Sequence, residues 1–148
     1  IETDMWLAMD YDLKKSMATI WGIYCGNRSS GSKVYRINIY DMYFSKDDSV
    51  LNFSYDFITC SETAEHFVFP REEFEKFDKM LKNNGILAIM TSMLDSKDNF
   101  KDWYYNRDPT HLSFYTKNTM IWISNKYNYE ITFFGSSVVL FKKYISIN

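Results

Sequence analysis

One segment of the chain, from Tyr55 to Met90, constrains the fold more than any other because it has the pattern of a strand, a helix and a strand. Its first part, Tyr55–Cys60, is β-prone and shows little polar alternation, which is typical of a strand buried on both faces. Its last part, Ile86–Met90, is a second continuous apolar run of the same kind. Two buried strands joined by a helix form a unit with parallel strands, so the segment predicts an α/β fold.

The stretch between the two runs carries the signals of an amphipathic helix. Pro70 suits a first helical turn, and Gly85 can adopt the left-handed conformation that often follows a helix. Between them, one apolar stripe recurs at spacings of three and four residues: Phe74, Phe77 and Leu81. We therefore expect a helix that begins at Pro70 and ends before Gly85.

The remainder of the C-terminal part contains a loop, a helix and a hairpin. Asp95–Pro109 is polar and aromatic and predicts a long loop, and loops of that length are often functional. Thr116 can cap a helix that runs to about Tyr127. Tyr129–Phe134 and Val138–Lys143 then predict an antiparallel hairpin around a Gly-Ser-Ser turn.

The N-terminal third has weaker patterns. Trp6–Met17 is compatible with a helix, and Thr19–Tyr24 and Lys33–Tyr40 with two strands separated by a loop at Cys25–Ser32. The whole pattern predicts a single domain, residues 1–148, with a shortened or atypical N-terminal third. Its fold class is α/β, with an open, mostly parallel Rossmann-like sheet, helices on both faces and a C-terminal antiparallel β-hairpin.

Composition narrows the range of partners. The chain has 17 Lys and Arg against 19 Asp and Glu, so it lacks the basic excess usual in nucleic-acid binders. No apolar run reaches the ~18 residues of a membrane span, and the N-terminus has no basic stretch of a secretion signal. The two cysteines fit reduced thiols. We expect a cytoplasmic protein with no membrane or nucleic-acid partner; the oligomeric state stays open.

Three segments and the terminal hairpin resemble class I S-adenosylmethionine-dependent methyltransferases. Tyr55–His66 resembles the central strand and following Glu-x-x-Glu-His turn of that family. Met80–Ile89 resembles its "LLKPGGxLxI" segment, and Trp103–Tyr115 resembles the "D-x-T-H-x-S-F" segment of a subgroup of small methyltransferases. The resemblance implies transfer of a methyl group from S-adenosylmethionine to an acceptor, with the hydroxyl of a small molecule as the leading expectation.

The cofactor side of this resemblance is incomplete. It implies that Gly26, Asn38, Cys60 and Glu62 contact the cofactor. Only Gly26 of the glycine-rich motif is kept, however, and Asn38 stands where an acid usually binds the ribose. The alternative is therefore a degenerate methyltransferase fold that no longer binds the cofactor and serves as a partner-binding or regulatory module.

Both histidines of the chain fall in motifs that the resemblance covers. In the implied fold His66 and His111 follow neighbouring strands, so they share one crevice with nearby carboxylates. Such O and N ligands could hold Mg²⁺ or Zn²⁺, with the ligand set Glu62, Glu65, His66 and His111. The same crevice predicts His111, Asp108 and His66 as catalytic residues, and Trp103, Tyr104 and Arg107 as substrate contacts.

Structural roles, or a catalytic role without a metal, are also compatible with the sequence for these residues. Glu65 and His66 could simply cap the helix near Pro70, and His111 could be a metal-free base oriented by Asp108. Both histidines could be structural. The aromatic residues near Trp103 could cover the edge of the core, and Arg107 could be an ordinary surface arginine.

Overall fold

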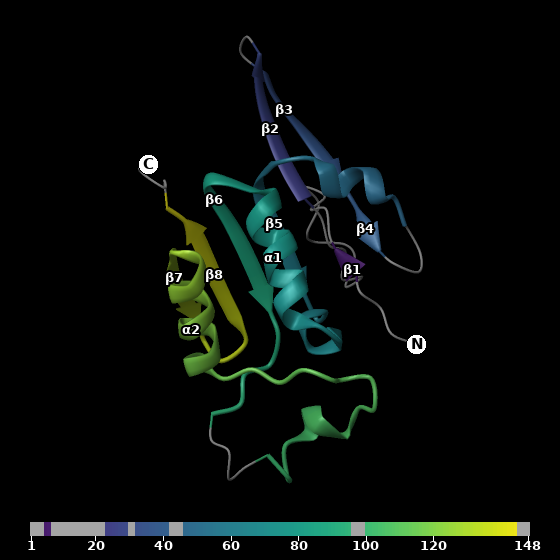
Figure 1. Ribbon diagram of the computed structural model, residues 1–148, viewed down its shortest axis with the longest axis vertical. Coiled ribbons are helices and arrows are strands. Elements are labelled where there is room, and N and C mark those ends of the chain that lie inside the picture. The colour runs from purple at the N-terminus through teal and green to yellow at the C-terminus, as the bar shows by residue number, and fades with distance from the viewer. Residues whose placement is uncertain (1–4, 7–22, 30–31, 42–45, 96–99, 145–148) are drawn as a thin grey trace.

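A six-stranded mixed sheet forms the centre of the protein in the computed structural model, which describes residues 5–6, 23–29, 32–41, 46–95 and 100–144 (Figure 1). The strand order is β3-β2-β5-β6-β8-β7, and a separate two-stranded sheet pairs β1 with β4. The strands are β1 (Met5–Trp6), β2 (Ile23–Ser29), β3 (Ser32–Asn38), β4 (Tyr40–Asp41), β5 (Tyr55–Ser61), β6 (Leu81–Met90), β7 (Tyr129–Phe134) and β8 (Val138–Lys143). The helices are α1 (Pro70–Met80), α2 (Lys117–Tyr127) and the short 3₁₀ turns η1 (Asp48–Asn52), η2 (Ala64–His66) and η4 (Tyr104–Arg107).

The predicted strand–helix–strand unit is confirmed. β5 and β6 pair in parallel, with Ile58 opposite Leu87 and Cys60 opposite Ile89, and α1 makes the crossover between them. All four of these side chains are buried. This is the one parallel pair among the described strands; the other neighbours pair antiparallel.

The prediction of a mostly parallel sheet is therefore wrong, and the reason lies in the N-terminal third. β2 and β3 form an antiparallel hairpin whose register runs from Ile23 opposite Asn38 to Ser29 opposite Ser32. Most of the segment expected to be a loop, Cys25–Ser32, is thus strand. A connection this short can only join antiparallel strands, which explains why the sequence has no crossover helix there.

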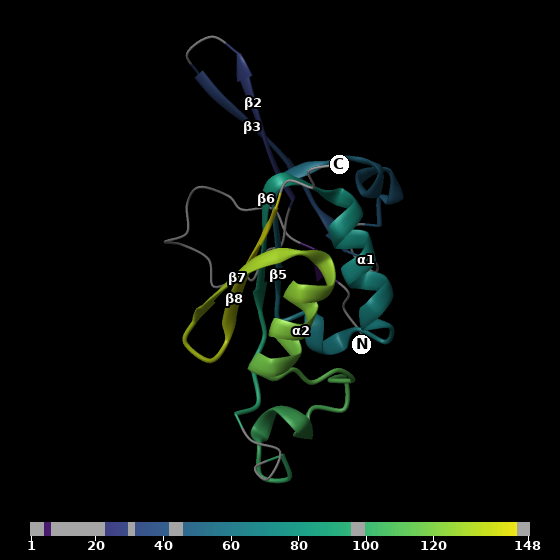
Figure 2. The ribbon, with the colours of Figure 1, turned by 60° about the vertical axis from the view of Figure 1, so that its left-hand side comes forward.

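Among the described residues, the prediction of helices on both faces is confirmed for one face only. The two described α-helices, α1 and α2, lie on the same face of the sheet (Figure 2). Phe74 and Phe77 of α1 are buried there, and the Phe74 ring packs edge-to-face on Phe141 of β8 with centroids 6.5 Å apart. The helix expected at Trp6–Met17 lies outside the described residues except for Trp6, which is in β1.

Helix α1 ends earlier than the sequence predicted. Leu81 already has extended backbone angles and is the first residue of β6, so the helix joins the strand directly. The extra residues at the start of β6 are taken up by an irregularity in the β5–β6 register, where Asn84 adopts a positive φ of 62°. Gly85 consequently lies buried in the strand and does not cap the helix.

The C-terminal elements agree with their predictions. Thr116 caps α2 by accepting a hydrogen bond from the Thr119 amide at 3.1 Å. β7 and β8 form the expected hairpin, and Gly135 takes φ 66° in its turn. Within the described residues, no helix is long and apolar enough to cross a membrane.

β6 leads into the segment 91–116, whose described residues lie at the end of the sheet opposite the β2–β3 hairpin, where β5 also has its carboxyl end (Figure 1). The Thr91 and Met93 amides anchor this segment to the turn between β7 and β8, where they donate to the Ser137 carbonyl at 2.9 Å and the Ser136 carbonyl at 3.0 Å. A bridge between Met93 and Tyr115 joins the two ends of the segment. The anchor holds the predicted loop against the carboxyl ends of the parallel strands, where open α/β sheets bind ligands.

Replacing Gly85 by alanine should destabilise the fold, because an added Cβ would lie 2.8 Å from the Lys82 carbonyl oxygen and 2.9 Å from Leu81 Cδ1. We expect a loss of about 1–3 kcal/mol in the free energy of unfolding, measured by chemical denaturation. Gly135→Ala is the control: its Cβ meets no atom within 4 Å, and only the positive φ opposes it, at about 1 kcal/mol. A smaller loss for Gly85→Ala than for Gly135→Ala would contradict the described close approach.

Candidate functional site

The candidate site forms where the turn after β5 meets the segment 104–113. The Glu65 carbonyl, in η2, accepts hydrogen bonds from the amides of Leu112 at 2.7 Å and Ser113 at 2.8 Å. The Ser113 hydroxyl donates to the Phe67 carbonyl at 2.7 Å, and the Tyr115 hydroxyl donates to the Ala64 carbonyl at 2.9 Å. These bonds join two segments far apart in the sequence, so the two predicted motifs meet as expected.

The two histidines lie against each other in this site. Their ring centroids are 4.9 Å apart, and each ring bonds a backbone carbonyl through Nδ1: His66 to Thr110 at 2.9 Å and His111 to Tyr105 at 2.7 Å. A carbonyl oxygen can only accept, so Nδ1 carries the hydrogen in both rings. A neutral ring then keeps its lone pair on Nε2, which is the tautomer that metal-binding and proton-accepting histidines need.

Glu65 supplies a carboxylate that is completely buried. Its Oε1 accepts a short hydrogen bond from the Tyr105 hydroxyl, whereas Oε2 has no hydrogen-bond partner among the described residues. One ligand atom each from Glu65, His66 and His111 lie within 4.8 Å of one another. An unsatisfied buried carboxylate oxygen beside two imidazoles fits a divalent cation.

The fourth predicted ligand, Glu62, lies outside this group of three. It follows β5 with a positive φ of 52°, a strained conformation for a residue with a side chain, and its amide donates to the Met90 carbonyl at 2.7 Å. The Tyr105 hydroxyl lies 3.4 Å from Glu62 Oε2, so Glu62 and Glu65 share one donor. Partial burial raises the pKa of the Glu62 carboxyl, and the negative charge of Glu65 raises it further.

Asp108 belongs to the site through its turn. Its Oδ1 accepts hydrogen bonds from the Thr110 amide at 2.9 Å and the Thr110 hydroxyl at 2.7 Å, and these bonds hold the pKa of Asp108 below its ordinary value. Its Oδ2 is 3.8 Å from His111 Nε2, which is beyond hydrogen-bond reach. The group that orients the His111 ring is therefore the Tyr105 carbonyl. The catalytic roles of His66, Asp108 and His111 stay predictions.

The predicted substrate contacts differ in their surroundings. The Trp103 ring packs in an aromatic cluster, 5.1 Å from Tyr105 and 5.8 Å from Phe114 between centroids. Tyr104 is 68% exposed and Arg107 is also exposed. Trp103 thus supports the segment internally, whereas Tyr104 and Arg107 are accessible to a ligand.

The structure separates the four predicted cofactor contacts into two groups. Cys60, which is buried, and Glu62 lie at the carboxyl end of β5. Gly26 lies within the β2–β3 hairpin, opposite Tyr35. The side-chain amide of Asn38 donates through Nδ2 to the Tyr55 hydroxyl at 3.0 Å, near the start of β5. The geometry brings only Cys60 and Glu62 to the strand ends, and all four stay predictions as cofactor contacts.

Tyr105 and Thr91 are site residues that the sequence analysis missed. Tyr105 is the buried member of three consecutive aromatic residues, and its hydroxyl also lies 3.3 Å from Thr91 Oγ1. Burial and the hydrogen bond to Glu65 raise the pKa of the Tyr105 hydroxyl, so it remains a donor. Nothing in the sequence distinguishes Tyr105 from its aromatic neighbours, because only the fold decides which ring turns inward.

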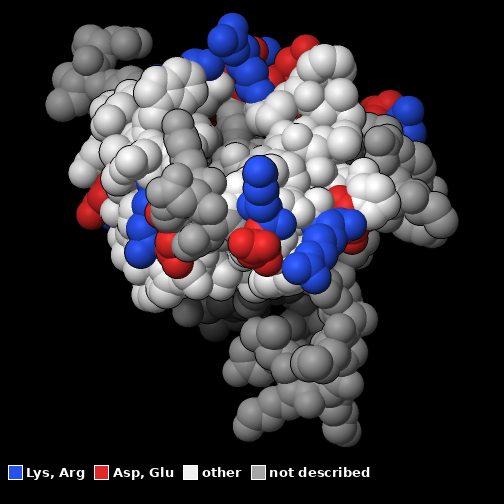
Figure 3. All heavy atoms as spheres, turned by 90° about the horizontal axis from the view of Figure 1, so that it is seen from below, with Lys and Arg blue, Asp and Glu red and all other residues white. Residues whose placement is uncertain are grey.

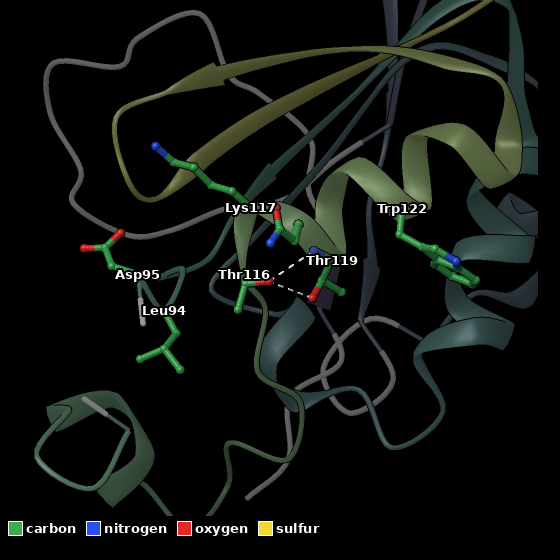
Figure 4. Close-up of a pocket in the computed structure, with 7 residues that line it drawn as sticks. Leu94, Asp95, Thr116, Lys117, Thr119 and Trp122 are labelled. Atoms are coloured by element: carbon green, nitrogen blue, oxygen red, sulfur yellow. Dashed lines mark hydrogen bonds between the residues drawn. The ribbon is translucent and has the colours of Figure 1, made fainter. Parts of the chain in front are cut away.

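The surface around the site is of mixed charge. Figure 3 shows the molecule from below, the end at which segment 91–116 lies in Figure 1. On this face basic and acidic side chains lie beside one another, and most of the remaining surface is uncharged. A cavity of about 560 Å³ opens between Leu94 and the start of α2 (Figure 4). Asp95 and Lys117 are among the residues that line it, and none of the predicted site residues does.

Comparisons with known proteins agree with this fold. The family model described as "Methyltransferase domain" matches residues 12–132. A solved structure of an O-methyltransferase family protein from Burkholderia thailandensis superposes with a TM-score of 0.52 at 15% identity, a likeness of fold alone. The match covers 71% of this chain and 36% of that one, so this chain spans about a third of that protein's length. No curated protein matches the sequence.

A pH-dependent effect on stability follows from the position of Glu62. A carboxyl whose pKa is raised by folding destabilises the native state once the pH exceeds its unfolded value, because the charged form is disfavoured there. The free-energy difference between Glu62→Gln and the wild type, measured without metal by chemical denaturation, should therefore shift in favour of the variant as the pH rises from 4 to 8. A difference independent of pH would contradict the raised pKa of the Glu62 carboxyl.

Proposed function

We propose a function for this chain from its membership of the methyltransferase domain family, an S-adenosylmethionine-dependent class. In this proposal it methylates a hydroxyl of a small molecule, with a divalent cation bound at Glu65, His66 and His111. The observation that carries the proposal is the buried Glu65 Oε2, which has no partner among the described residues, beside two histidines whose Nε2 lone pairs are free of the ring hydrogen. Mg²⁺ and Zn²⁺ both accept such oxygen and nitrogen ligands.

S-adenosylmethionine would supply an electrophilic methyl group, which passes to the acceptor oxygen as the carbon–sulfur bond breaks. A bound cation would lower the pKa of the acceptor hydroxyl and orient its oxygen. The residues of this chain then have one task in the metal-bound form: Glu65 and the two histidines would hold the cation and so position the acceptor. Their Nε2 lone pairs are occupied by the cation, so the proton of the acidified hydroxyl leaves to water.

Two features support placing this chemistry at the ends of β5 and β6. Their carboxyl ends open onto the site, and ligands of open α/β sheets bind at such ends. The strained backbone of Glu62 lies at the same edge, and strain of this kind is concentrated at functional positions. The exposed Tyr104 and Arg107 are proposed to contact the acceptor.

A metal-free form of the same function uses His111 alone as the base. It is supported by the Nδ1–H donation to the Tyr105 carbonyl, which leaves Nε2 unprotonated in the neutral ring. A chelator distinguishes the two forms, because it abolishes only the metal-assisted reaction.

Replacement of Glu65 by glutamine tests the ion site directly. We expect the affinity for Co²⁺ or Zn²⁺, measured by calorimetry, to fall at least about tenfold, since the neutral amide is a poor ligand for a divalent cation. Glu72→Gln is the matched control because Glu72 is an exposed glutamate on α1, and it should bind the ion as the wild type does. Equal affinities in all three proteins would remove Glu65 from the proposed site.

Calorimetric titration with S-adenosylhomocysteine tests the cofactor half. We expect one-to-one binding, with and without a chelator, if Cys60 and Glu62 lie at a working cofactor site. The absence of binding by folded protein would instead favour a fold without cofactor, acting as a partner-binding or regulatory module. The observation behind that second candidate is the β2–β3 hairpin, which places Gly26 in a strand.

A further inference from the structure

We infer that Tyr105 is a positioning residue that fixes both Glu65 and His111 for a bound cation. The inference rests on the proposed function, because a cation is what gives these two side chains a shared task. Tyr105 is 5% exposed and contacts each of them through a different group.

The contact with Glu65 is made by the hydroxyl. It donates to Oε1 of a carboxylate that is fully buried and whose Oε2 has no partner among the described residues. A carboxylate turns as a plane about its last carbon–carbon bond, so a donor that holds one oxygen also sets the direction of the other. Tyr105 thereby leaves Oε2 as the available ligand atom.

The contact with His111 is made by the backbone and the ring. The Tyr105 carbonyl accepts the Nδ1–H of His111 at 2.7 Å, and the two ring centroids are 4.1 Å apart at an interplanar angle of 49°. The first contact fixes the tautomer, and the second limits rotation of the imidazole. Partners of this kind tune a ligand without touching the ion.

Tyr105 is itself held by the aromatic cluster of its own segment. The Trp103 ring lies 5.1 Å from Tyr105 between centroids, and Phe114 lies 5.8 Å from Trp103. Thr91 Oγ1, at the end of β6, lies 3.3 Å from the Tyr105 hydroxyl. The Trp103 ring and the Thr91 hydroxyl thus restrict the movement of the Tyr105 side chain, and an ion site requires such rigidity of the residues that support its ligands.

A double-mutant cycle tests the inference. Tyr105→Phe removes only the hydroxyl and keeps the ring and the carbonyl, so the fold should persist, as a melting curve can verify. We expect Co²⁺ affinity, read from the absorption of the bound ion, to fall about tenfold in Tyr105→Phe. In a Glu65→Gln background the same replacement should cause no further loss, because the hydroxyl acts through the carboxylate.

Two further measurements separate positioning from general support of the fold. Tyr129→Phe removes another buried tyrosine hydroxyl, which donates to Asp78 Oδ1 at 2.9 Å away from the site, and should leave Co²⁺ affinity unchanged. In the metal-free wild type, the Tyr105 hydroxyl proton should give a slowly exchanging downfield NMR signal that shifts in Glu65→Gln. This signal remains a test if Tyr105→Phe does not fold.

The outcomes are distinct. Loss of affinity in Tyr105→Phe that disappears in the Glu65→Gln background supports the inference. If the wild type binds Co²⁺ and Tyr105→Phe binds it equally well, the role of Tyr105 is overturned and the ion site stands. The same conclusion follows if the losses in Tyr105→Phe and Glu65→Gln are additive in the double mutant. A folded wild type that binds no Co²⁺, Zn²⁺ or Mg²⁺ overturns the ion site and the positioning role with it.

Discussion

The candidate site depends on one pairing, between the main chain of Glu65 and the amides of Leu112 and Ser113. Both bonds converge on a single carbonyl oxygen, so the turn after β5 and the segment after β6 are held at one point. The two histidine rings meet beside it: the His66 ring bonds the Thr110 carbonyl of the second segment, and the His111 ring is held within that segment by the Tyr105 carbonyl. Together with the Ser113 and Tyr115 hydroxyls, which bond carbonyls of the same turn, this connection brings the three potential ligands together.

The central unit could be predicted from the sequence because its signals are local. A continuous apolar run specifies a buried strand, and the stripe through Phe74 and Phe77 specifies a helix against it. The same is true of the terminal hairpin and of the Thr116 cap. The end of α1 could not be predicted, because Leu81 continues the helical spacing although tertiary pairing with Tyr55 makes it a strand residue.

The site could be predicted only in part. The fold implied by the resemblance placed Glu65, His66 and His111 at one edge of the sheet, and the structure brings their ligand atoms within 4.8 Å of one another, while their role as ligands stays a prediction. The resemblance also included Glu62, which lies outside the group of three, and it favoured Trp103 and Tyr104 over Tyr105. The prediction for the N-terminal third was wrong because the resemblance implied parallel strands there, whereas β2 and β3 form an antiparallel hairpin.

The order of the strands also bears on how the protein reaches its native state. The β7–β8 hairpin forms from neighbours in sequence, whereas β6 must find β8, as in the pairing of Ile86 with Lys142. Closing so long a loop costs chain entropy and is slow compared with hairpin formation. The segment that carries His111 lies inside that loop, so we expect the Leu112 and Ser113 amides to gain protection late in pulse-labelled hydrogen exchange. A newly made chain would thus form its terminal hairpin before it assembles the candidate site.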